Sequence, residues 1–168
     1  LRKEHPDAAV HLECRDHWEK RSTSLGDLQA APLAPEQTAT WWVAETFSRF
    51  VAERGEEAPP FFCWLGIPDP HHPWQPPVEL AQAFTQRGVM PAIRGGPAAP
   101  VSAKGNLDAH EDREAIIRYV RQYTNAQNAL IDRAVGHVLD ALRRAGLLDD
   151  AVILFCSAHG DSLGDYGR

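Results

Sequence analysis

The chain has few cysteines, and they form no recognisable framework. Its 168 residues include three, Cys14, Cys63 and Cys156, which lie far apart. An odd number at such spacings fits neither a set of disulfides nor a zinc pattern. Cys63 and Cys156 lie in apolar stretches, so we expect both to be small buried hydrophobic residues. Cysteine usage fits a reducing compartment but leaves cytoplasmic and periplasmic or secreted locations open.

Long apolar runs and basic stripes are also missing. No stretch is long enough to cross a bilayer. A formal net charge of −6 without a basic stripe argues against a nucleic-acid-binding protein. No signal peptide is recognisable, although a chain that begins with Leu1 leaves a preceding segment open. We therefore expect neither nucleic acid nor membrane as a partner, and the pattern does not predict the oligomeric state.

Three segments carry the features of helices. Apolar residues recur at helical spacing over residues 35–54 and, most regularly, over residues 111–145. Pro35 suits the first turn of the first helix, because proline has no N–H to leave unpaired there. Gly146 follows the long helix as a stop. Residues 78–85 are predicted to form a short third helix.

Two short apolar runs predict strands. Residues 61–67 and 152–156 are continuous apolar runs of strand length, typical of strands buried on both faces of a parallel sheet. The first leads into residues 68–77, where the many prolines exclude helix and central strand and predict a stiff loop. Residues 86–110 read as an irregular excursion and residues 1–34 as a poorly defined edge. Strands that alternate with helices predict an α/β fold.

Two histidines in the proline-rich loop are the first candidates for chemistry. His71 and His72 directly follow the first predicted strand, where an open α/β sheet places its ligands. Prolines reduce the freedom of the loop, so an imidazole is held there at low entropic cost. The functional interpretation is a general acid or an anion-binding group. The alternative is a pair of solvated surface histidines.

The second predicted strand leads into the other candidate, His159. This histidine is either a metal ligand or base at a strand end, or a turn residue that bonds a neighbouring carbonyl. Asp161 and Asp165 follow it and offer carboxylate oxygens of the kind that hard divalent cations prefer. Aspartates at turns equally often accept hydrogen bonds from backbone N–H groups. Both interpretations stay open from the sequence alone.

Taken in order, these motifs resemble those of the sulfatase family. Residues 60–77, PFFCWLGIPDPHHPWQPP, are similar to the sulfatase segment in which an apolar strand runs into DPHxPF or DPHxPW. Residues 123–146 resemble the sulfatase helix with the pattern D-x-x-V/I-G-x-V/I-L-x-x-L. Residues 149–165, DDAVILFCSAHGDSLGD, resemble DDTVIVFTSDHGDMLGD. The resemblance covers about residues 35–168.

The resemblance implies a fold and a domain organisation. Sulfatases have an alkaline-phosphatase-like α/β sandwich, with a mostly parallel central sheet flanked by helices. Residues 1–168 would then be a single partial domain, with residues 35–168 as its core. We also expect the isolated chain to be poorly soluble or oligomeric, because its predicted strands would leave apolar surface and unpaired backbone groups exposed.

The resemblance also implies an activity and roles for residues. Sulfatases cleave sulfate esters of small molecules with a formylglycine nucleophile and a divalent cation. That cation is most often Ca²⁺, with Mn²⁺ or Mg²⁺ as alternatives. His71 matches the catalytic, substrate-binding histidine of the DPH motif, and the adjacent His72 is a further substrate-binding candidate. His159 matches the histidine of the metal site.

Several departures from the family pattern qualify this expectation. Ala158 occupies the position of the metal-ligand aspartate of the DHG motif, and a methyl group cannot coordinate a cation. Asp161 is a weak substitute ligand. None of the cysteines begins a C/S-x-P-x-R motif, and two further metal aspartates and a lysine have no counterpart. We therefore expect a central piece of a sulfatase-like hydrolase that is inactive by itself. The alternatives are a degenerate sulfatase-like protein that binds anions or partners, and a phosphonate or phosphodiester hydrolase.

Overall fold

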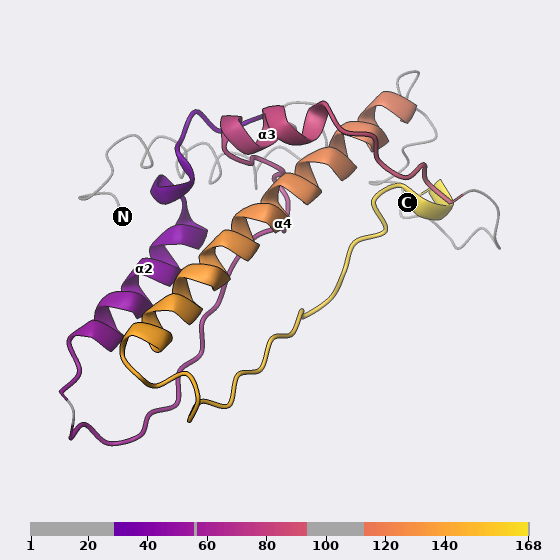
Figure 1. Ribbon diagram of the computed structural model, residues 1–168. Helices are drawn as coiled ribbons and strands as arrows, with labels where there is room; N and C mark the ends of the chain where they lie inside the picture. The colour runs from indigo at the N-terminus through magenta and orange to yellow at the C-terminus, as the bar shows by residue number, and fades with distance from the viewer. Residues whose placement is uncertain (1–28, 56, 94–112, 168) are drawn as a thin grey trace.

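The structure, a computed structural model, describes residues 29–55, 57–93 and 113–167. Its main elements in chain order are the α-helices α2 (Ala39–Ala52), α3 (Val78–Thr85) and α4 (Arg113–Arg144). Two 3₁₀ turns, η2 (Pro35–Gln37) and η4 (Asp165–Gly167), flank them. α2 and α4 lie side by side, and α3 lies against α4 near the N-terminal end of α2 (Figure 1).

The helix α2 begins four residues later than the sequence predicted. Pro35 opens the 3₁₀ turn η2 instead, and the chain is extended at Thr38 before α2 starts. The Thr38 hydroxyl donates to the Pro35 carbonyl at 2.7 Å and accepts from the Trp41 N–H at 3.2 Å. Thr38 is therefore the N-cap, because its hydroxyl pairs a backbone N–H that the helix leaves unpaired.

The short helix is confirmed over the predicted residues. The long helix is confirmed over Arg113–Arg144, and its predicted first residues, 111 and 112, lie outside the described residues. α4 stops at Arg144, and Gly146 takes the left-handed conformation with φ 69°. The Leu147 N–H donates to the Leu142 carbonyl at 2.9 Å, and the Gly146 N–H to the Arg143 carbonyl at 3.1 Å. These two bonds form a Schellman cap, which pairs carbonyls that the last turn leaves open.

The helices are held by two apolar clusters on α4. One joins Phe47 and Val51 of α2 to Leu142. The other joins Leu80 of α3 to Ala126 and Leu130, of which Leu130 is fully buried. His137 adds a polar contact between the long helices: its ring stacks on Trp41, and its Nε2 lies 2.9 Å from a Glu45 oxygen. His137 therefore contributes to the packing of α2 against α4.

The predicted strands do not form a sheet among the described residues. Residues 61–67 and 152–156 are extended but are paired in no ladder, and the bridge between Ala31 and Pro77 is isolated. Most of their apolar side chains are exposed, at 89% for Phe62 and 90% for Leu154, whereas Leu65 and Ile67 are half-buried. Cys63 and Cys156 are exposed as well, so the prediction that these segments and their cysteines are buried was wrong for this chain.

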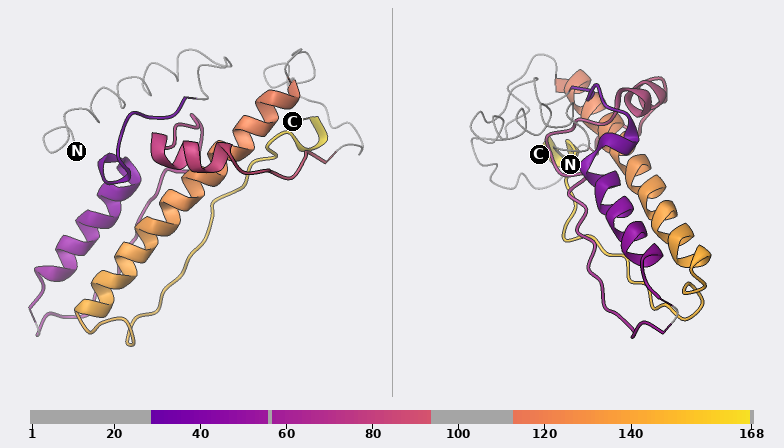
Figure 2. Two further views of the ribbon diagram at one scale, coloured as in Figure 1. Left: turned by 45° about the horizontal axis from the view of Figure 1, so that its top comes forward. Right: turned by 90° about the vertical axis from the view of Figure 1, so that its left-hand side faces the viewer.

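The reason for this difference is that a strand needs a neighbour. A helix pairs its own backbone groups locally, whereas a strand pairs them only with another strand. Both extended segments nevertheless run in the same direction, from the end of α4 near Arg144 towards α3 (Figures 1 and 2). Within the described ranges, no helix has the length and hydropathy needed to cross a membrane.

Candidate functional site

The proline-rich loop that carries His71 and His72 is held at both ends. At its start, the Asp69 carboxylate accepts hydrogen bonds from Thr40 of α2 and Gln127 of α4. At its end, Pro76 and Pro77 are fully buried. Their backbone pairs with Ala31, whose N–H donates to the Pro76 carbonyl at 2.8 Å. The loop is thus a fixed feature of the helical core and not a loose surface segment.

The rings of His71 and His72 lie against each other. Their centroids are 4.0 Å apart, and the Nδ1 atom of His71 is 2.6 Å from the His72 carbonyl oxygen. A carbonyl oxygen only accepts, so Nδ1 of His71 must carry a proton and donate. His71 is exposed, whereas His72 is half-buried and its ring centroid lies 6.0 Å from that of Trp74.

His159 approaches His71 from the other extended segment. The two ring centroids are 6.4 Å apart, and the rings are nearly perpendicular, at 72°. The Nδ1 atom of His159 is 3.2 Å from the Gly160 carbonyl, so the same argument places its proton on Nδ1. Ser157 further supports this turn, because its hydroxyl donates to the His159 carbonyl. The structure thus brings together the two histidines that the sequence singled out, while their roles stay predictions.

The described residues do not by themselves make a metal centre. Within the described ranges, no three His, Cys, Asp or Glu side chains gather closely enough to hold an ion. The side chain of Ala158 offers no metal-binding atom beside His159, and Asp161 is exposed. One imidazole is a poor site for a hard cation, which prefers several oxygen ligands. The donor set found here therefore does not fit a cation without ligands from elsewhere.

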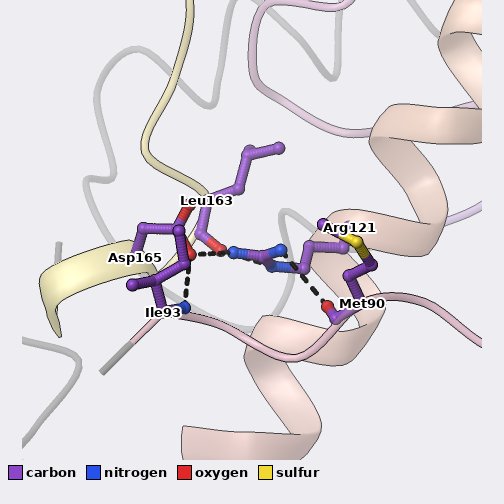
Figure 3. Close-up of polar contacts among 5 residues, drawn as sticks. All are labelled: Met90, Ile93, Arg121, Leu163 and Asp165. Carbon is purple, nitrogen blue, oxygen red and sulfur yellow. Dashed lines mark hydrogen bonds and ion pairs between the residues drawn. The ribbon is translucent and has the colours of Figure 1, made fainter.

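Asp165 has a structural role instead (Figure 3). Its Oδ1 atom accepts from the Ile93 N–H at 2.7 Å and from the guanidinium of Arg121 on α4. Arg121 also donates to the Leu163 carbonyl at 2.9 Å and the Met90 carbonyl at 3.2 Å. This cluster ties two loops to α4. Of the two interpretations of Asp165, the structure supports the one in which it accepts from backbone N–H groups.

Gly164 allows this turn to lie directly on α4. Its φ is 89°, and a Cβ atom there would lie 2.6 Å from a side-chain carbon of Ile117. Any other residue would therefore be strained by its backbone conformation and would also clash with α4. The tight turn at Gly164 is thus explained by its close packing against Ile117 of α4.

Two buried polar residues that hold the loop, Thr40 and Gln127, were not predicted from the sequence. Thr40 and Gln127 are 0% and 2% exposed. Each lies on the apolar face of its helix, Thr40 four residues before the buried Ala44, and Gln127 three residues before Leu130. A polar residue in an apolar stripe was the available indication, because a buried polar group needs a partner.

Comparison with known proteins adds a family and several relatives. A family model described as Sulfatase matches residues 16–168. The choline-sulfatase of Rhizobium meliloti (strain 1021) is 42% identical over 62 residues, which are 37% of this chain and 12% of that protein. The iduronate 2-sulfatase of Mus musculus is 26% identical over 138 residues, covering 71% of this chain and 25% of that protein.

A third relative gives the same picture. The arylsulfatase of Clostridium perfringens (strain 13 / Type A) is 28% identical over 140 residues, covering 76% of this chain and 27% of that protein. The chain thus spans between 12% and 27% of the length of these three curated relatives.

The Asp165 cluster predicts a dependence of stability on acid pH. The Ile93 N–H and the Arg121 guanidinium lower the pKa of Asp165, while partial desolvation opposes the shift. The folded chain therefore favours the ionised carboxylate. Its contribution to stability is complete above the ordinary Asp pKa of about 3.9 and is lost as the pH falls through the lower folded-state pKa.

We expect the free energy of unfolding of Asp165→Asn to fall less between neutral and acid pH than that of the unsubstituted chain, because no carboxylate at position 165 is left to be protonated. Denaturant unfolding followed by circular dichroism between pH 6 and the acid limit measures it. Asp132→Asn, at an exposed position on α4, is the matched control and should leave the acid limb unchanged. An Asp165→Asn chain whose acid limb coincides with that of the unsubstituted chain would contradict the assignment.

Proposed function

Because the chain belongs to the sulfatase family, we propose that it forms the central part of a sulfuric-ester hydrolase whose complete protein acts on a small-molecule sulfate ester. The observation that supports this most is the approach of His71 and His159, with ring centroids 6.4 Å apart, from two separate family motifs. Histidines placed together at the ends of two extended segments suit the binding of one oxyanion.

We propose further that residues 61–67 and 152–156 become neighbouring strands of a mostly parallel sheet. Family membership implies an alkaline-phosphatase-like α/β fold. The two segments run in the same direction and expose apolar side chains that a sheet would cover. In this proposal residues 1–168 form one partial domain, with residues 35–168 as its core. Residues 86–110 are an excursion from that core, and residues 1–34 lie at its edge.

In the proposed reaction, His71 serves the leaving group. Attack on sulfur breaks the bond between sulfur and the alcohol oxygen, and the departing oxygen needs a proton. Nε2 of His71 is the position that carries this proton, because Nδ1 already donates to the His72 carbonyl. A formylglycine in the complete protein would supply the nucleophile. His72 binds the sulfate group beside His71, whose ring it contacts.

Sulfatases generally use a divalent cation, and we propose Ca²⁺ for the complete protein, with Mn²⁺ or Mg²⁺ as alternatives. His159 is its candidate ligand in this chain. Ala158 provides no side-chain oxygen where the family motif has an aspartate, and Asp161 is the weak substitute. The remaining ligands must come from outside the described residues, so no step of the reaction is derived from the ion.

Ala158 also favours a second candidate function. A site that lacks a carboxylate ligand holds a cation less tightly, and a weakened site suits a protein that binds anions or partners without turnover. His71 and His159 would then only bind the anion. If the protein is a hydrolase, the loss of activity on substitution of His71 should depend on the leaving group of the substrate. If the protein only binds, it should not hydrolyse the ester at all.

We expect His71→Ala in the complete protein to lower kcat for aryl sulfates by about 10²–10⁴-fold, the usual contribution of a general acid. The loss should be larger for phenyl sulfate than for 4-nitrophenyl sulfate, because nitrophenolate leaves readily without a proton. His137→Ala is the control histidine, since it pairs with Glu45 between the helices. Equal losses for both substrates, or for both histidines, would contradict the role of His71.

Restoring a carboxylate at position 158 separates the two candidate functions. We expect Ala158→Asp in the complete protein to raise Ca²⁺ affinity, followed by calorimetric titration, and to raise aryl sulfate hydrolysis, because it adds a charged ligand beside His159. Ala158→Asn adds an oxygen without the charge and should gain less. If Ca²⁺ affinity rises while hydrolysis stays absent, the binding protein is the correct description. A preference for phosphonate esters in the paired assay would instead indicate a phosphonate or phosphodiester hydrolase.

A further inference from the structure

We propose that Asp69 is a positioning residue. Its carboxylate, held by α2 and α4, fixes the positions of His71 and His72, which follow it in the loop. Asp69 lies two residues before His71 and is bonded by the side chains of Thr40 and Gln127. We call these three residues the Asp69 clamp. This inference rests on the proposed function, since it concerns the same histidines, but it assigns a role to residues that the function does not use.

The clamp joins three parts of the chain through charge-assisted hydrogen bonds. Gln127 Nε2 donates to Oδ1 of Asp69 at 2.8 Å, and the Thr40 hydroxyl donates to Oδ2. Each donor comes from a different long helix, and both donors are buried, with Thr40 at 0% and Gln127 at 2% exposed. Hydrogen bonds to an ionised acceptor are about twice as strong as neutral ones. Asp69 therefore sits at one place relative to both helices.

The connection from Asp69 to the imidazoles is short and stiff. The His71 N–H donates to the Pro68 carbonyl at 3.2 Å, which closes a turn around Asp69. Pro70 and Pro73 limit the backbone of the intervening residues, because the proline ring fixes φ. Pro73 is buried, and the loop is anchored again beyond it. A displacement of Asp69 thus has little room to be absorbed before it reaches the rings.

The position of Asp69 favours orientation over proton transfer. Both of its oxygens already accept hydrogen bonds from the protein. The orientation of the Gln127 amide depends on this contact, since its Oε1 atom has no hydrogen-bond partner among the described residues. In the clamp, Gln127 is therefore the donor and Asp69 the acceptor. Substitutions at the two positions can exchange these roles.

A polarity swap tests the clamp. In Gln127→Glu, a second carboxylate faces Asp69, and the loop should be displaced. In the double variant Asp69→Asn with Gln127→Glu, the Asn amide donates to the new carboxylate while its oxygen still accepts from Thr40. The matched control is Asn128→Asp, which converts an amide to a carboxylate at the next position of the same helix, where the side chain is exposed.

Two readouts are measured on the complete protein. The first is the nuclear Overhauser cross-peak between the His71 and His159 ring protons in protein labelled at histidine Cε1, assigned by single histidine substitutions. The second is the split of kcat and KM for 4-nitrophenyl sulfate. We expect Gln127→Glu to abolish the cross-peak and lower kcat at least tenfold with KM within twofold. The double variant should restore the cross-peak and bring kcat to within threefold of the unsubstituted protein, and the control variant should change neither readout.

The outcomes separate the clamp from the activity. A folded Gln127→Glu protein with an unchanged cross-peak and kcat overturns the positioning role, as does a folded double variant that restores neither. The cross-peak can be lost in Gln127→Glu and restored in the double variant while neither the variants nor the unsubstituted protein hydrolyse the ester. In that case the positioning role of Asp69 is supported and the hydrolase proposal is wrong.

A second variant covers the case in which Gln127→Glu does not fold. Thr40→Val removes the other hydrogen bond to Asp69 without adding charge, and we expect it to weaken the cross-peak and kcat at least threefold. Thr46→Val, at an exposed position on the same helix, is its control and should change neither. An unchanged cross-peak and kcat in Thr40→Val overturn the proposal.

Discussion

The Asp69 carboxylate is the contact on which the arrangement of this chain depends. It is the point where α2, α4 and the histidine loop meet, through Thr40 and Gln127. Apolar packing brings the two helices together, but apolar contacts are not directional. A buried hydrogen-bonded carboxylate is directional, because its donors must lie along particular lines. The packing thus provides proximity, and the clamp provides the orientation of His71.

A second cluster fixes the position of the segment that carries His159. Arg121 of α4 bonds Asp165 and the Leu163 carbonyl, and so fixes the end of the segment that carries His159. Gly164 allows that turn to touch α4. The segments that carry His71 and His159 are therefore both held by α4, the first through Gln127 and the second through Arg121. A common support of this kind explains how residues so distant in sequence come within 6.4 Å between ring centroids.

The helices were predictable because their determinants are local. Apolar spacing, the stop at Gly146 and the length of α3 all appear in the sequence itself. The start of α2 was misplaced, because Pro35 suits a 3₁₀ turn as well as an α-helix and the cap at Thr38 was overlooked. The strands at 61–67 and 152–156 were predicted from apolar runs, but an apolar run does not determine its pairing partner, and neither segment is paired in a ladder among the described residues.

The site was predictable in part for the same reason. His71, His72 and His159 stood out through their motifs, and the structure brings them together. Thr40 and Gln127 were not found, because their role exists only once two helices and a loop have met. Asp69 was inside a recognised motif, yet its function depends on partners that are distant in sequence.

In the proposed arrangement, His71 and His159 lie at the ends of two neighbouring strands, and their imidazoles share one anion-binding face. A crystal structure of the complete protein with bound sulfate tests it most directly. We expect residues 61–67 and 152–156 to be adjacent parallel strands, with both rings within hydrogen-bond reach of the same sulfate. Strands separated in the sheet, or rings that point to opposite faces, would contradict it.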